Sequence, residues 1–104
     1  MDRLGQLKQF MAEEPDDPFN AYALALEYLK TDPKESILIF ERLTLSHPQY
    51  LPTYYPYAQL LIEQKNSAKA EMIFEKGCEM AKQVNDPKTL RELQSAHQDW
   101  KFTD

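Results

Sequence analysis

The sequence predicts an all-α fold, an α-solenoid of about six helices stacked as antiparallel pairs. Apolar residues recur at the three- and four-residue intervals of one helix face, and no stretch alternates apolar and polar residues as a half-buried strand does. Only 2 of the 104 residues are glycine, so tight β-hairpin turns are hard to build. An internal repeat then indicates that the helices form a stacked array.

The repeat places small and aromatic residues at fixed separations. In the second half of each unit the paired residues lie 34 apart, and they are Ser36 with Ala70, Phe40 with Phe74, and Leu43 with Gly77. In the first half they lie 33 apart, and they are Ala21 with Tyr54, Leu24 with Tyr57, Ala25 with Ala58, and Tyr28 with Leu61. Stacked arrays of this kind typically present extended binding surfaces to other proteins.

The first three helices are delimited by caps and prolines. The first is expected over 2–14, where Asp2 can cap it and the following proline ends it. The second runs from near Asp17 to about Lys30, and the third covers 33–46 with Asp32 as its cap. Both begin with a proline in the first turn, where a missing N–H costs little.

The last three helices follow the same rules with two irregularities. The fourth begins late or irregularly, because Pro56 would fall just past the first turn of a helix that starts near Pro52. The fifth has Ser67 as its cap and extends to about Val84. It contains Gly77, which costs about 1 kcal/mol relative to alanine and is justified where a neighbouring helix approaches closely. Residues 85–87 repeat the cap-then-proline start.

Composition excludes several classes of function. The net charge of −5 repels phosphate backbones, and no dense basic patch offsets it, so no nucleic-acid partner is expected. No apolar run approaches the ~20 residues that span a bilayer, so no membrane partner is expected either. Cys78 is the only cysteine and cannot form an internal disulfide, which favours a reducing, cytoplasmic location.

No residue pattern predicts catalysis, a metal or a cofactor. His47 and His97 lack the spacing to each other, or to Cys78, that metal coordination needs. We interpret Cys78 as a buried apolar side chain, with a reactive thiol as the alternative. The acidic residues at 13–17 straddle a helix end and the next helix start, where carboxylates act as caps.

The repeated residues resemble the tetratricopeptide repeat, an antiparallel helix pair of roughly 34 residues. Its first helix carries a large–small pair and then a tyrosine, positions held here by Leu24, Ala25 and Tyr28 and again by Tyr57, Ala58 and Leu61. Its second helix carries a small residue and an aromatic four later, held by Ser36 and Phe40 and again by Ala70 and Phe74. Lys82 replaces the closing proline, which the first unit retains as Pro48.

The resemblance implies one right-handed domain over 1–104. An N-terminal half-repeat helix would occupy 1–15, full repeats 17–48 and 50–84, and a solvating C-terminal helix 86–101.

The resemblance also implies where a partner binds, because the first helices of such repeats line a concave groove that holds a peptide. By phase, the groove positions are Phe19, Tyr22, Leu26, Leu29, Lys30, Tyr55, Gln59, Ile62 and Glu63. Each first helix thus carries a second apolar stripe beyond what its partner helix needs, as binding surfaces do. The basic clamp with which some family members grip acidic tails is not carried over. We therefore predict a non-enzymatic module that binds an apolar peptide or protein segment.

Two alternatives stay open. The groove side chains could simply fill the interior of a small protein. The chain could instead be a self-associating structural module, a homodimer that pairs Leu90, Leu93 and Trp100 of the last helix across a two-fold axis.

Overall fold

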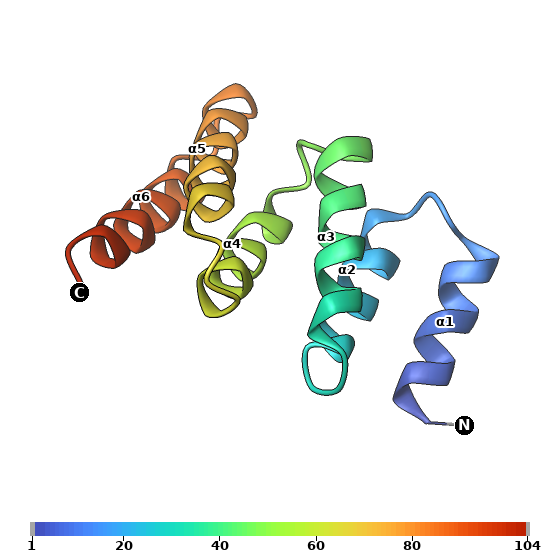
Figure 1. Ribbon diagram of the computed structural model, residues 1–104. Helices are drawn as coiled ribbons and strands as arrows, with labels where there is room; N and C mark the ends of the chain where they lie inside the picture. Colours follow the sequence, from blue (N-terminus) through green and yellow to red (C-terminus); the bar gives the residue numbers. More distant parts are fainter. Residues whose placement is uncertain (1, 104) are drawn as a thin grey trace. The chain divides into compact units, whose positions relative to one another are not determined.

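The computed structural model describes residues 2–103, which form six α-helices, one short 3₁₀ helix and no strand (Figure 1). In chain order they are α1 (Arg3–Glu13), α2 (Pro18–Tyr28), α3 (Pro33–Ser46), η1 (Leu51–Thr53), α4 (Tyr54–Glu63), α5 (Ser67–Gln83) and α6 (Pro87–Lys101). They make two compact units, which divide between Tyr50 and Leu51. The predicted all-α class is confirmed.

The first unit is built on the pair α2 and α3, which lie side by side, with α1 packed on α2. Ala25 and Phe40 are completely buried between the helices. The buried Ser36 hydroxyl donates a 2.7 Å hydrogen bond to the Ala25 carbonyl and so ties the two helices together. The Asn20 amide donates to the carbonyls of Phe10 and Glu14 at 3.3 and 3.2 Å, which ties α2 to the end of α1.

The second unit repeats the plan with α4 and α5 as the pair, and α6 packs against both. Ala58 and Phe74, the repeat equivalents of Ala25 and Phe40, are also completely buried. Tyr54 and Tyr57, which the sequence assigned to the space between helices, are 0% exposed. Burial raises the pKa of the Tyr54 hydroxyl to about 12. The two repeats therefore use the same core positions, as predicted.

The helix starts agree with the sequence except at α5. The side chains of Asp2, Asp17, Asp32 and Asp86 accept hydrogen bonds from backbone N–H groups in the first turns of α1, α2, α3 and α6. The irregular start expected around Pro56 is the 3₁₀ turn η1, after which α4 begins. The prediction of Ser67 as the cap of α5 was wrong. Ser67 is already helical, and the Asn66 side chain accepts from the Lys69 N–H instead.

Two helices end on left-handed residues that the sequence analysis did not anticipate. After α4, Lys65 has φ 61°, the Asn66 N–H bonds the Leu61 carbonyl and the Lys65 N–H bonds the Ile62 carbonyl. After α5, Asn85 with φ 58° occupies the equivalent position. This six-to-one and five-to-two pattern is the Schellman motif, usually built with glycine. Lysine therefore carries backbone strain at position 65.

Gly77 marks the closest helix approach in the second unit. A Cβ at this position would lie 2.8 Å from Tyr54 Cβ and 2.9 Å from Leu93 Cδ1, closer than carbon atoms pack. Both α4 and α6 thus reach α5 at a residue without a side chain. Leu93 is 2% exposed here, so the expectation that it offers leftover surface for a homodimer was wrong. The homodimer itself stays a prediction.

Gly77→Ala is expected to destabilise the protein although alanine favours helices. Alanine gains about 1 kcal/mol of helix propensity, but overpacking against Tyr54 costs about 1–3 kcal/mol, so a net loss of roughly 1 kcal/mol follows. Urea unfolding followed by circular dichroism measures it. Glu75→Ala, an exposed change on the same helix, is the control and should be nearly neutral. A Gly77→Ala protein more stable than the parent would contradict the close approach.

Lys65→Gly is expected to stabilise the protein by about 0.5–1 kcal/mol, because glycine adopts the left-handed conformation without Cβ strain but loses more chain entropy on folding. The matched control is Gln64→Gly, one residue earlier, where φ is −83° and glycine should only destabilise. Thermal and urea unfolding give both values. Equal effects of the two substitutions would contradict the assignment of strain to position 65.

Candidate interaction surface

Tyr55 is an exposed aromatic residue of the second unit around which several surface hollows lie. It is 49% exposed, whereas Tyr54 and Tyr57 on the same helix are completely buried. Its side chain lines three adjoining hollows between α4 and α6. Tyr55, a predicted groove residue, is therefore exposed to solvent, while the buried Tyr54 and Tyr57 anchor the helix that carries it.

One of these hollows, which combines several predicted residues with unpredicted ones, is a groove of about 490 Å³. We call it the α4–α6 groove, and its walls are Tyr55, Gln59 and Ile62 of α4, Ala96, Asp99 and Trp100 of α6, and Thr103. The structure thus brings together three of the four groove residues predicted on α4. Glu63 is exposed but does not line it.

Sequence reasoning missed the α6 wall. It treated the last helix as a solvating cap and read its apolar residues only for self-association. The signal was present, because residues 96, 99 and 100 follow the three- and four-residue spacing of one helix face. What the sequence did not show is that this face turns toward α4.

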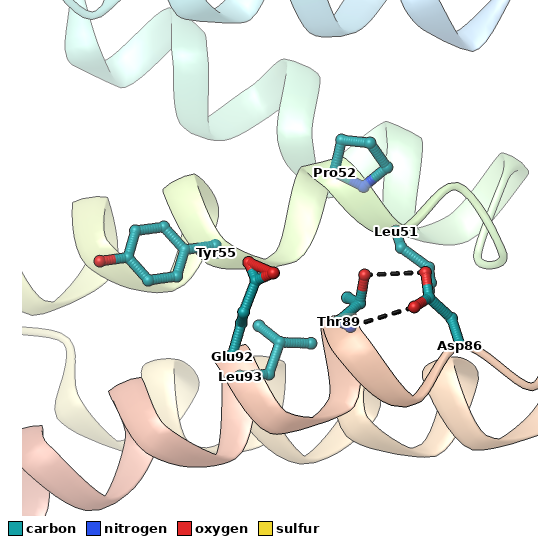
Figure 2. Close-up of a pocket in the computed structure, with 7 residues that line it drawn as sticks. All are labelled: Leu51, Pro52, Tyr55, Asp86, Thr89, Glu92 and Leu93. Atoms are coloured by element: carbon teal, nitrogen blue, oxygen red, sulfur yellow. Dashed lines mark hydrogen bonds between the residues drawn. The ribbon is translucent and has the colours of Figure 1, made fainter.

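The second hollow, of about 230 Å³, lies where α4 and α6 begin, and Figure 2 shows Tyr55 and Glu92 on facing helices. The Asp86 carboxylate accepts hydrogen bonds from the Thr89 N–H at 3.0 Å and the Thr89 hydroxyl at 2.8 Å. These bonds lower the pKa of Asp86 and commit it to capping α6. The Glu92 carboxylate instead points from α6 toward the helix that carries Tyr55 (Figure 2).

The third hollow adds charge beside the aromatic ring. Tyr55 and Ala96 line it together with Arg91, Glu92 and Asp99. Asp99 and Tyr55 line both this hollow and the α4–α6 groove, so a carboxylate and an aromatic ring border the same continuous surface.

The predicted groove positions of the first unit lie on and just after α2. Phe19 is 57% exposed, and Tyr22 is half-buried with its ring edge-on to Tyr50 at 5.8 Å between centroids. Leu26 and Leu29 are half-buried. Because α2 ends at Tyr28, Lys30 lies in the following turn and not on the helix, where it pairs with Glu27 at 3.2 Å.

None of the nine predicted groove residues is buried, so the alternative that they merely fill the interior is not favoured. Binding at these positions stays a prediction.

Two solved structures resemble this chain. The solution NMR structure of a tetratricopeptide repeat domain protein from Salinibacter ruber is 36% identical, covers 82% of this chain and 87% of its own, and superposes with a TM-score of 0.77. A crystal structure of a tetratricopeptide repeat domain protein from the same organism is 34% identical, covers 85% of this chain and 99% of its own, and has the same TM-score. No family model and no curated protein matched the sequence.

The chain belongs to the tetratricopeptide repeat family. Its fold is an all-α helical repeat, in which α2 packs on α3 and α4 packs on α5. The bounds of the two repeats, 17–48 and 50–84, stay a prediction. Tetratricopeptide repeats in general serve protein–protein interaction and are typically non-catalytic, which gives the surface around Tyr55 its interest.

The chemistry of the remaining titratable residues follows from their surroundings. Among residues 2–103, no three His, Cys, Asp or Glu side chains are placed to hold a metal ion. Burial raises the pKa of the half-buried Cys78 thiol, which disfavours the reactive thiolate. Within the same range no helix is long and apolar enough to cross a bilayer.

His97 holds α6 against the second tetratricopeptide repeat. Its ring stacks on Phe74 at 4.8 Å between centroids, and its Nε2 lies 2.7 Å from the Glu71 carboxylate. Lys101 reaches the other Glu71 oxygen at 3.0 Å. Hydrogen bonds from His97 and Lys101 lower the pKa of Glu71. This cluster fixes one wall of the α4–α6 groove.

The Glu71 cluster makes part of the stability depend on pH. A carboxyl whose pKa is lower folded than unfolded stabilises the protein above its ordinary pKa, near 4.5, and loses that contribution as pH falls through the lowered value. Glu71→Gln should therefore lower Tm at neutral pH, and the gap from the parent should close in acid. Thermal unfolding from about pH 7 to about pH 3 tests this, with the exposed Glu75→Gln as control. A gap that stays constant in acid would contradict it.

Proposed function

We propose that this tetratricopeptide repeat protein is a non-enzymatic module that binds an apolar peptide or protein segment, with the α4–α6 groove as its principal site. The observation that carries the proposal is the exposure of Tyr55 on a helix whose other tyrosines are fully packed. A rigid aromatic side chain half in water loses little entropy on binding and offers much contact area.

The size and character of the groove support an occupant the size of a short peptide segment. A volume of about 490 Å³ falls within the range of about 300–1,000 Å³ typical of ligand sites. Ile62 and Trp100 give it apolar walls, and Gln59 and Thr103 offer hydrogen bonds that can fix a backbone. The α2 face, with the exposed Phe19, is proposed as a separate contact of the same kind.

The remaining properties of the proposal follow from composition. The net charge of −5 disfavours nucleic acid, and the single cysteine suits a cytoplasmic setting. The proposed partner is therefore another protein, and neither a metal nor a cofactor is needed for the interaction.

Tyr55→Ala is expected to lower the affinity for the partner by about tenfold or more, because an aromatic anchor at an interface contributes about 2 kcal/mol of binding free energy. Partners captured from host lysate by the parent protein would be identified by mass spectrometry and then titrated by calorimetry. Met72→Ala removes a side chain that is 61% exposed on α5 and is the matched control. Circular dichroism confirms that both variants fold. Full binding by Tyr55→Ala together with loss in Met72→Ala would place the site elsewhere.

A further inference from the structure

We infer that the segment held by the α4–α6 groove carries a basic side chain, lysine or arginine, next to its apolar anchor. The inference rests on the proposed function and adds the chemistry of the partner. It concerns the end of the groove where the ring of Tyr55 meets the acidic face of α6.

The acidic character of this end comes from two carboxylates. Glu92 and Asp99 are exposed residues seven apart on α6, so they face the same side about 10 Å apart along the helix. Both border the hollow beside Tyr55, and neither makes a side-chain hydrogen bond or ion pair among residues 2–103. Their charge is thus available to a partner.

The basic residues near Glu92 and Asp99 are too few to neutralise the negative charge on this surface. Among residues 2–103, Arg91 is the only basic residue that lines the three hollows around Tyr55. Lys101, on the same helix, is already engaged by Glu71 at 3.0 Å. Asp86 contributes further negative charge, although its oxygens are held by Thr89. The surface is therefore complementary to a cation, as is the net charge of the whole chain.

The aromatic ring adds a second attraction for the same group. A lysine or arginine head that reaches Asp99 comes close to the half-exposed ring of Tyr55, because both residues line the same two hollows. Cations over aromatic faces gain electrostatic stabilisation from the ring. The neighbouring apolar side chain of the partner would then lie against Ile62 and Trp100. An acidic segment would be repelled by the Glu92 and Asp99 carboxylates at the same place.

The test uses the full chain labelled with ¹⁵N and titrated with synthetic peptides in two-dimensional NMR. The probe carries two leucine–lysine pairs in a glycine–serine background. One comparison peptide has glutamate for lysine, and another has serine for leucine. The expected result is that the leucine–lysine probe shifts the amides of Tyr55, Ala96 and Asp99, and that the glutamate peptide does not.

Asp99→Asn provides the decisive variant, because it keeps the shape of the side chain and removes its charge. The substitution is expected to lower the affinity for the probe by about threefold, which is the scale of a partly exposed ion pair. Adding Tyr55→Ala, which is expected to cost about tenfold by itself, should bring the combined loss to about thirtyfold. Glu79→Gln, the same charge change at an exposed site on α5, should leave binding unchanged. Raising the salt concentration should weaken the probe as well.

The outcomes separate this inference from the proposed function. If lysine and glutamate peptides shift the groove amides equally and Tyr55→Ala abolishes both, the groove binds peptides but the basic preference is overturned. If Asp99→Asn and Glu79→Gln weaken the probe equally, the effect is net charge alone and the inference is again overturned. If no peptide shifts the groove amides while the partner captured from lysate does, the module binds without the preference inferred here. If neither does, both fail.

Discussion

The second unit depends on one steric constraint, the meeting of three helices at Gly77. Because α5 has no side chain there, Tyr54 Cβ and Leu93 Cδ1 come within 2.8–2.9 Å of where a Cβ would stand. This contact sets how close α4 and α6 lie to α5, and therefore the width of the surface between them. It also explains why neighbouring tyrosines on α4 differ, since packing Tyr54 into the core turns Tyr55 outward.

A second interaction works on the other end of α6. The stack of His97 on Phe74 and the ion pairs of Glu71 with His97 and Lys101 fix the C-terminal half of α6, beyond the contact that Leu93 makes. Phe74 is the repeat-defining aromatic of α5 and is fully buried. Phe74 thus belongs to the core of the repeat and also contacts α6 through His97. The groove wall formed by α6 is consequently supported by a residue of the repeat itself and not by a separate element.

Most of the fold could be predicted from the sequence because its determinants are local. Aspartate–proline starts and the spacing of Phe40 and Phe74 need no knowledge of distant residues. The errors lay where a choice depends on backbone geometry. Asn66 and Ser67 are both good N-cap residues, and the sequence does not show which of them precedes the first helical residue of α5. No propensity predicts Lys65 in a left-handed conformation. The α4 half of the groove followed from the repeat phase. The α6 half did not, because its placement is a tertiary result of Gly77.

If the α4–α6 groove is the binding site proposed above, its polarity is the feature that most limits its partners. In an apolar groove without charge, many exposed hydrophobic segments would bind alike, and selectivity would rest on shape alone. Carboxylates on the rim change this, because they repel acidic segments, whereas the attraction of a basic segment offsets the cost of desolvating them. Glu92 and Asp99 lie where they remain solvated in the unbound protein, so they carry no desolvation cost until a partner arrives. Discrimination then comes from repulsion of the wrong segment as much as from attraction of the right one.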